Sequence, residues 1–215
     1  MKKKLILGAA ALPLVLAAAA APAAPSNAGW YGDVTAGDAR LHQSSGGLDA
    51  AFANQGLTTS TGLDRGHAAF GLHLGYRFNE NWALEGGYEN FGTHNFGSTV
   101  TAPAADTLSG SYRAHAWSFA PVGILPLNDR WALFGKVGLT ENRARLSVAS
   151  NTGATAPAGV SHSNAGYLFG GGATYDFSRS VYGTLEMDRY ARIGTSASTG
   201  RTDANLLSVG VGVRF

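Results

Sequence analysis

The sequence predicts an all-β fold: an eight-stranded antiparallel up-and-down transmembrane β-barrel with short periplasmic turns and long extracellular loops. Three observations favour it. Apolar residues alternate with small or polar ones in eight segments, a polar turn recurs at a fixed spacing, and large aromatic residues lie near one end of the segments. Strand side chains point alternately to opposite faces, so this alternation gives each strand one apolar and one polar face. An apolar outside around a polar interior is typical of barrels in lipid.

The last ten residues show the alternation most clearly. One face carries Leu207, Val209, Val211, Val213 and Phe215, and the other carries Ser208, Gly210, Gly212 and Arg214. An open sheet edge cannot be satisfied in lipid, so we expect this strand to pair with the first one and close the barrel. The eight strands are expected at residues 29–41, 67–78, 82–91, 112–125, 131–143, 165–177, 181–191 and 206–215.

A polar turn precedes three of these strands. It consists of Asn79-Glu80-Asn81, Asn128-Asp129-Arg130 and Ser178-Arg179-Ser180, at spacings of 49 and 50 residues. A fixed period of this length predicts a repeated hairpin unit. The other four connections are long and rich in Gly, Ser, Thr, Asn and Ala, at 42–66, 92–111, 144–164 and 192–203. Short turns are periplasmic in such barrels, which places both termini on the periplasmic side.

Pro121 conflicts with a regular strand at 112–125. Proline cannot donate a hydrogen bond to the ladder, and a closed barrel has no free edge on which to place it. We therefore expect a β-bulge at Pro121.

The first 28 residues have the order of a secretory signal peptide. Met1-Lys2-Lys3-Lys4 is basic, an apolar run extends from Leu5 to Ala21, and small residues lead to Ala28. We expect residues 1–28 to be cleaved and residues 29–215 to form the barrel. The apolar run is also about long enough to span a bilayer, so an N-terminal membrane anchor is the alternative.

Loss of the leader changes the charge of the chain. The sequence has 16 Lys and Arg residues against 14 Asp and Glu residues, and removal of three leader lysines leaves 13 basic residues. No basic run survives, so we expect no nucleic-acid partner. The absence of cysteine excludes disulfides and thiolate metal ligands. No stretch of 18 apolar residues follows the leader, so helical membrane spans are not expected.

Large aromatic residues lie close to the short-turn end of the expected strands: Trp30, Trp82, Trp131, Tyr175 and Phe215. Aromatic residues at one level are typical of a girdle at the membrane–water interface. The alternative is a soluble eight-stranded carrier barrel, which would turn its large apolar residues inward and its charges outward. The aromatic girdle favours the membrane barrel.

The whole expected barrel resembles the transmembrane domain of OmpA-type outer-membrane proteins. The motifs that carry the resemblance follow in order: Trp30-Tyr31, Ala83-Leu84-Glu85-Gly86-Gly87-Tyr88, Leu125-Pro126-Leu127, Leu133-Phe134-Gly135-Lys136-Val137-Gly138, Gly171-Gly172-Ala173-Thr174-Tyr175, Leu185-Glu186 and Phe215. The resemblance implies the outer membrane of a Gram-negative bacterium, with its lipid and lipopolysaccharide and the barrel-assembly machinery as partners. Many members carry a peptidoglycan-binding domain after the barrel, and none is expected here.

The polar faces of the expected strands carry a set of titratable residues: His73, Arg77, Glu85, Glu89, Lys136, Glu186 and Asp188. Charges enclosed in a narrow lumen are costly unless they are paired. The resemblance implies a plug of ion pairs, and we expect Glu85 and Glu186 to flank Lys136. Such a plug is either a gate that opens a narrow water path or a filler that makes a small barrel rigid, since eight strands leave little room for a channel.

The sequence predicts a structural or surface-interaction role, without catalytic residues, metal or cofactor. The six histidines lack the spacing of a metal site. His162-Ser163-Asn164 resembles a segment of outer-membrane lipid A deacylases, but adjacent strand residues point to opposite faces. The alternatives are a small-solute pore and a lipid A deacylase-like enzyme. An extracellular ligand would be expected to bind at the long loops.

Overall fold

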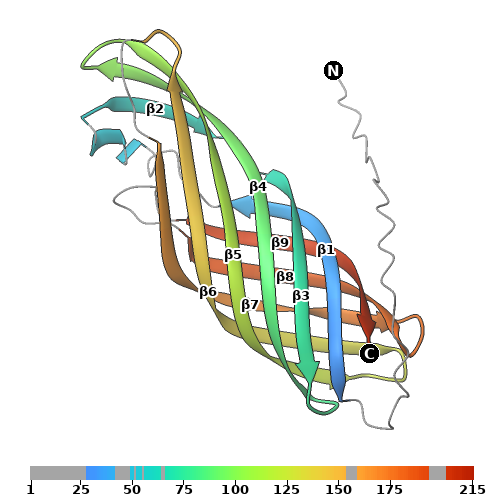
Figure 1. The fold of residues 1–215 in the computed structure, drawn as a ribbon. Coiled ribbons are helices and arrows are strands. Elements are labelled where there is room, and N and C mark those ends of the chain that lie inside the picture. Colours follow the sequence, from blue (N-terminus) through green and yellow to red (C-terminus); the bar gives the residue numbers. More distant parts are fainter. Residues whose placement is uncertain are drawn as a thin grey trace, which may run out of the picture.

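A computed structural model describes residues 28–41, 49–50, 52–54, 56–63, 66–153, 159–193 and 202–215. Residues 1–27 of the expected leader lie outside this range, and so do many residues of the expected long loops. The described part of the chain is almost entirely strand (Figure 1). Its strands are β1 (Gly29–Leu41), β2 (Thr58–Leu63), β3 (Gly66–Arg77), β4 (Trp82–Ala102), β5 (Asp106–Pro126), β6 (Trp131–Ser150), β7 (Val160–Asp176), β8 (Val181–Ile193) and β9 (Thr202–Arg214).

Eight of these strands form a closed antiparallel ring, which confirms the predicted fold. Around the ring the order is β1, β3, β4, β5, β6, β7, β8 and β9, and β9 pairs again with β1. Only β2 stands outside the ring among the described strands. It pairs with the outer part of β4, from Leu63 opposite Phe96 to Thr58 opposite Ala102. The ring therefore has no free edge over its common length.

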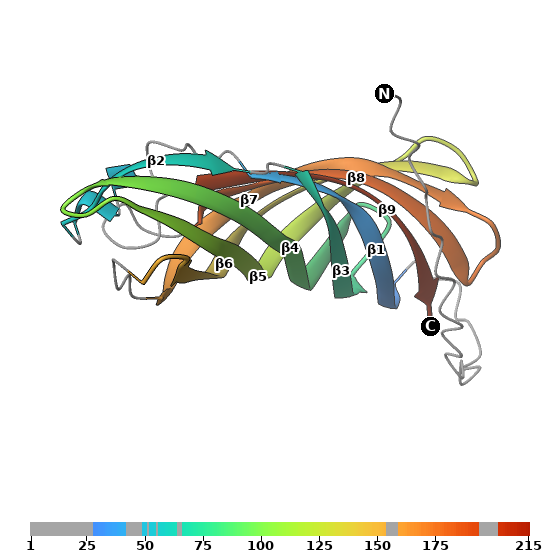
Figure 2. The ribbon, with the colours of Figure 1, turned by 90° about the horizontal axis from the view of Figure 1, so that it is seen from above.

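The seam of the ring joins the first and last strands. β9 runs beside β1 with Val211 opposite Val34, and Figure 2 shows the two strands next to each other. The N–H of Phe215 donates to the carbonyl oxygen of Trp30 at 3.0 Å, so pairing continues to the terminal aromatic residue. The prediction that the last strand closes the barrel against residues 29–41 is confirmed.

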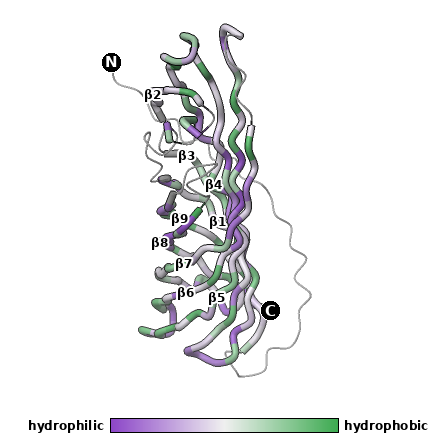
Figure 3. Tube along the Cα trace, turned by 90° about the vertical axis from the view of Figure 1, so that its left-hand side faces the viewer, coloured by the Kyte–Doolittle hydropathy of each residue, from purple (hydrophilic) through white to green (hydrophobic). Residues whose placement is uncertain are grey.

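Apolar side chains cover the outside of the ring. Leu139 is 67% exposed and Val209 is 60% exposed, whereas the adjacent residues Thr140 and Ser208 are buried. The same alternation is visible along the strands as a change from hydrophobic to hydrophilic colour (Figure 3). A soluble carrier barrel would have the opposite arrangement. The outer face is therefore suited to lipid. The described residues contain no helix long and apolar enough to cross a membrane.

The recurring turns have one physical basis. The side-chain oxygen of Asn79 accepts hydrogen bonds from the backbone N–H groups of Asn81 and Trp82, at 2.9 and 3.0 Å. Asn128 accepts from the two equivalent N–H groups of the second turn at 2.9 Å each. In the third turn Ser178 does the same with its hydroxyl, at 3.3 and 3.0 Å. A first turn residue that satisfies two backbone donors explains why Asn or Ser recurs there.

Two of the expected long loops are largely strand, so their prediction as loops was wrong. β4 and β5 continue through residues 92–102 and 106–111, and β6 continues to Ser150. Buried apolar residues alternate with exposed Ser, Thr and Gly along these segments, as at Phe96, Val100 and Leu108. A high content of Ser, Thr and Gly predicts a loop, and it concealed the period-two pattern. We call this extension, together with β2, the distal end, because it lies opposite the short turns (Figure 1).

The predicted bulge at Pro121 was also wrong. Pro121 pairs with Leu84 in the same register as its neighbours on β5. On the β6 side the ladder lapses between Phe119 and Val122 and resumes without a shift. The missing N–H thus interrupts the ladder locally and does not displace it. The described bulge in the β4–β5 ladder lies between Asn90 and Thr93, where Gly92 has a φ of 79° that a side chain would disfavour.

An apolar core fills the inside of the distal end. Its large side chains come from β4 to β9 and from the short helical segment that contains Phe52: Phe52, Phe91, Phe96, Val100, Leu108, Tyr112, Leu146, Leu168, Tyr190, Ile193 and Leu206. Phe91 and Tyr190 are in edge-to-face contact, with ring centroids 4.9 Å apart. This core lies between the polar part of the lumen and the outermost residues of the distal end.

Candidate functional site in the barrel interior

Lys136 lies at the centre of the lumen among carboxylates from two other strands. Its Nζ is 3.1 Å from Oε1 of Glu85 on β4 and 3.3 Å from Oδ2 of Asp188 on β8. It also contacts Oε1 of Glu186, two positions from Asp188 on the same face of β8. The Lys136 side chain is 1% exposed, so these ion pairs are shielded from bulk water. The structure thus brings four predicted site residues into one cluster: Glu85, Lys136, Glu186 and Asp188.

A second cluster is built around His73 on β3. Nδ1 of His73 lies 2.7 Å from Oδ1 of Asp33, and Nε2 lies 3.0 Å from Oε1 of Glu89. The first contact is a hydrogen bond, and the second is a close approach without hydrogen-bond geometry that becomes an ion pair when His73 is protonated. Only the doubly protonated imidazolium has a donor at each ring nitrogen. The arrangement therefore suits a charged His73 between two carboxylates.

Two tyrosines from other strands donate hydrogen bonds to carboxylates of these clusters. Tyr31 donates to Oε2 of Glu85 at 2.8 Å, and Tyr182 donates to Oδ2 of Asp33 at 2.8 Å. Each carboxylate thus contacts one cation and one phenol. Hydrogen bonds of this kind lower the free energy of a buried carboxylate and also fix its orientation.

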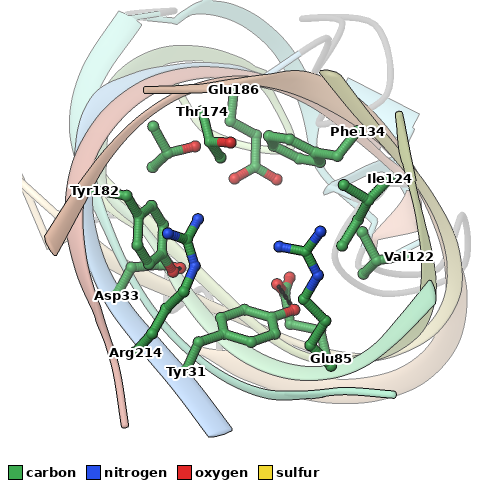
Figure 4. A pocket seen from close by; sticks show the side chains of 12 residues that line it. Tyr31, Asp33, Glu85, Val122, Ile124, Phe134, Thr174, Tyr182, Glu186 and Arg214 are labelled. Atoms are coloured by element: carbon green, nitrogen blue, oxygen red, sulfur yellow. Dashed lines mark hydrogen bonds between the residues drawn. The ribbon is translucent and has the colours of Figure 1, made fainter. Parts of the chain in front are cut away.

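The short-turn end of the lumen opens into a pocket (Figure 4). It offers about 60 Å³ of space for water and is lined by polar residues on one side and by the apolar Val122, Ile124 and Phe134 on the other; the polar ones include Tyr31, Asp33, Glu85, Glu186 and Arg214. In the close-up the labelled side chains point toward a common centre from different strands. Arg214 forms an ion pair with Asp176 at 2.8 Å, and its guanidinium lies 4.5 Å from the centroid of the Tyr182 ring. Predicted residue Arg77 also lines the pocket, but it donates to the turn carbonyls of Asn79 and Glu80.

Polar residues above the Lys136 cluster lack hydrogen-bond partners. They are Thr140, Asn142 and Tyr190, and Asn142 is 0% exposed with both amide atoms unpaired. Five carboxylates stand against Lys136 and His73 in the buried part of the lumen: Asp33, Glu85, Glu89, Glu186 and Asp188. The carboxyl groups outnumber the two basic side chains, so loss of either basic side chain would leave buried carboxyl groups without a partner.

The predicted girdle residues all lie near the short-turn end. Trp30, Trp82, Trp131 and Phe215 are each about half exposed on the outer face. Tyr175 is in tilted contact with Trp131, with ring centroids 4.9 Å apart. They lie at the level at which an aromatic girdle would meet the membrane–water interface.

Five residues of the interior network were not predicted from the sequence. They are Tyr31, Asp33, Asp176, Tyr182 and Arg214. Alternation along β1 could have found Tyr31 and Asp33, because both share a face opposite Trp30. Their partners lie on β4 and β8, and only the register of the closed ring brings these strands to the same level.

The residues of the deacylase-like segment do not form a catalytic pair. Ser163 is exposed on the outer face of β7, and His162 alternates with it toward the interior. In the β6–β7 ladder Ser163 is opposite Arg143 and His162 is opposite Ala144. Within the described ranges, no group of three or more His, Asp or Glu side chains is arranged to hold a metal ion.

An eight-stranded ring with an apolar outside and a charged interior defines an integral outer-membrane β-barrel protein. The family model of the OmpA-like transmembrane domain matches residues 25–215, and the chain belongs to this family. The protein is therefore located in the outer membrane of a Gram-negative bacterium, with its short turns toward the periplasm and its distal end outside the cell. No curated protein sequence matches the chain.

Solved structures of other outer-membrane barrels share this fold. OprG of Pseudomonas aeruginosa is 15% identical with a TM-score of 0.56, over 87% of this chain and 96% of that one. The neisserial surface protein NspA is 14% identical with a TM-score of 0.51, over 86% and 97%. Ail of Yersinia pestis is 16% identical with a TM-score of 0.50, over 86% and 98%. At these identities the likeness concerns the fold alone.

Proposed function

We propose that this protein is a non-conducting, non-enzymatic barrel that holds a rigid β-extension at the cell surface for interaction with other molecules. The observation that carries the proposal is the apolar core of the distal end, above the Lys136 and His73 clusters. Ions cross such a core poorly, because they would leave water for an apolar medium. We also propose that lipopolysaccharide surrounds the barrel in the outer leaflet and that the barrel-assembly machinery inserts it.

The length of the distal strands supports a role at the surface. β4 and β5 have 21 residues each and β6 has 20, whereas β1, β8 and β9 have 13 each. A residue adds about 3.3 Å to a strand, so these hairpins rise well beyond the hydrocarbon layer. Their apolar core makes the extension rigid, and a rigid surface binds partners with a smaller loss of conformational entropy.

A small-solute pore is the second candidate. The periplasmic pocket favours it, because a charged and water-accessible entrance already leads to the Lys136 cluster. Switching of Lys136 between its carboxylate partners would have to be accompanied by movement of the apolar core. The two candidates therefore differ in whether the distal end opens.

Planar-bilayer recording of the purified barrel separates these candidates. We expect no steady current from the wild type or from Lys136→Ala, because the apolar core is intact in both. A steady current from the wild type would favour the pore. Mass spectrometry of lipid A from cells with and without the protein tests the non-enzymatic part of the proposal, and loss of one acyl chain in its presence would contradict it.

A further inference from the structure

Basic side chains from β5 and β6 meet on the outer face of the sheet. Arg113 is directly opposite Arg145, and His115 is directly opposite Arg143. The three arginines are exposed, and His115 is partly buried. We call these four residues the basic patch. Like charges placed directly opposite each other destabilise a sheet unless another group compensates for them.

The described residues do not neutralise the basic patch. Among the described residues, none of its arginines forms an ion pair or a side-chain hydrogen bond. Glu141 is exposed on the same face, opposite Trp117 and two residues before Arg143, and no ion pair joins it to an arginine of the patch among the described residues. Arg189, by contrast, is paired with Asp203 at 2.7 Å on the same side of the molecule. The arginines of the basic patch are therefore available to an anion from outside the described part of the chain.

The basic patch lies directly above the lipid-facing surface. Tyr88 is in ring contact with both His115 and Trp117, with centroids 5.9 and 4.9 Å away. Farther toward the short turns, Phe119 and Leu139 are 59% and 67% exposed. From the periplasmic level of Leu125 to Trp117 the strand rises roughly 26 Å at about 3.3 Å per residue. A tilt of about 40° reduces this rise to roughly 20 Å along the membrane normal. The nine residues from Trp117 to Leu125 are within the about 9–11 that a tilted strand needs to cross a bilayer, and the basic patch begins just beyond them.

We propose that the basic patch binds the phosphate groups of lipid A, the phosphorylated disaccharide that anchors lipopolysaccharide in the outer leaflet. This inference rests on the proposed lipopolysaccharide partner and names the residues that contact it. Guanidinium groups bind phosphate through paired N–H donors, which gives both charge and geometry. The acyl chains of the same lipid would lie along Trp117, Phe119 and Leu139.

Hydroxyl groups beside the basic patch suit a sugar phosphate. Ser163 is opposite Arg143 and Ser161 is opposite Arg145 in the β6–β7 ladder, and both serines are exposed. On the other side Thr93 is opposite Arg113. The patch is thus a row of cations between hydroxyl groups, and all of them project from one sheet face at the level of the lipid headgroups.

The test uses the full barrel in nanodiscs of a zwitterionic phospholipid. Diphosphoryl lipid A and its dephosphorylated form are titrated against the wild type, Arg113→Ser/Arg145→Ser and Arg179→Ser. Arg179 is exposed in a periplasmic turn and provides a control for loss of charge. A folded band in SDS gels run without boiling and an unchanged circular-dichroism spectrum verify that each variant is folded.

We expect diphosphoryl lipid A to bind the wild type at least about tenfold more tightly than the dephosphorylated form, because charge-assisted hydrogen bonds are lost with the phosphates. The double variant should lose this preference, whereas Arg179→Ser should keep it. Equal binding of both lipid forms, or an undiminished preference in the double variant, would overturn the assignment. Inhibition by inorganic phosphate at equal concentration would show a site for soluble anions and would overturn the lipid assignment. An absence of lipid A binding by the wild type would also contradict the lipopolysaccharide partner, whatever the conductance experiment shows.

Discussion

The buried charged side chains of the lumen are stabilised by a few close partners, and Lys136 has more of them than the others. Three carboxylates lie within ion-pair distance of its Nζ, and its side chain has almost no contact with solvent. A buried ion pair contributes little net stability when it is complete, but loss of one partner leaves the other charges desolvated and unpaired. A glycine of the barrel wall, Gly170, leaves the space that Lys136 and Asp188 occupy.

Replacement of Lys136 by alanine should destabilise the barrel. We expect a loss of roughly 3–5 kcal/mol in the free energy of unfolding, because three buried carboxylates lose their cation. Urea unfolding in detergent micelles measures it. Lys136→Met fills the same volume without the charge, so an equal loss in both variants assigns the effect to charge. An unchanged urea midpoint for both variants would contradict the role of Lys136.

Gly170 on β7 should not tolerate a methyl group. A Cβ at this position would collide with Oδ1 of Asp188 and lie 3.2 Å from Cε of Lys136. Overpacking of this kind costs about 1–3 kcal/mol, so Gly170→Ala should lower the urea midpoint. Gly135→Ala is the matched control, because its Cβ would lie 3.9 Å from the nearest backbone oxygen on the open outer face. Equal stability of the two variants would refute this view of the lumen wall.

At the level of the elements, composition predicts the periplasmic turns correctly but predicts the distal extension wrongly. The turns are polar and short, and their first residue holds two backbone N–H groups. The extension is rich in Ser, Thr and Gly, yet it is strand, because alternate residues such as Phe96, Val100 and Leu108 are buried in the apolar core. Burial of alternate residues decides between the two, and composition does not.

The first residue of each turn should be replaceable only by another acceptor. Asn128→Ala removes the acceptor for Arg130 and Trp131, so we expect a loss of about 1 kcal/mol in unfolding free energy. Asn128→Ser should retain most of the stability, since Ser178 occupies the equivalent position in the third turn. Equilibrium urea titrations of the three proteins measure the difference. A serine variant as unstable as the alanine variant would disprove the shared role.

On the scale of the whole molecule, closure of the ring is the property from which the others follow. The seam between β1 and β9 satisfies both edges, and the ring places strands distant in sequence around one lumen. Tyr182 reaches Asp33 across this seam, although the two residues are 149 positions apart in the chain. Cooperative resistance to unfolding is the expected consequence.

Removal of Phe215 should weaken closure and assembly. The variant loses the hydrogen bond from the Phe215 N–H to Trp30 and the terminal aromatic side chain at the periplasmic level. We expect the mobility of the wild type in SDS gels to change on boiling, because the folded barrel resists SDS until it is heated. The deletion variant should show lower membrane levels and less of the folded band. Normal levels with a full folded band would count against a role of Phe215 in closure.

Local sequence patterns were sufficient to predict the architecture of the barrel. Alternation of apolar and polar residues is a local property, so it predicted eight strands, the apolar outer face and the last strand as the closing one. The regular spacing of Asn79, Asn128 and Ser178 likewise predicted the hairpins, since a turn depends on adjacent residues. These features follow from interactions within a few positions of the chain.

Contacts between strands that are distant in sequence could not be predicted from the local patterns. The register around the ring placed Asp33 against His73 and Asp188 against Lys136, and it aligned Arg113 with Arg145. The burial that turned the Ser- and Thr-rich segments of β4 to β6 into strand is supplied by Phe52, Tyr190 and Leu206, which lie elsewhere in the chain. Contacts of this kind depend on the relative level of strands, and closure of the sheet sets that level for all of them at once.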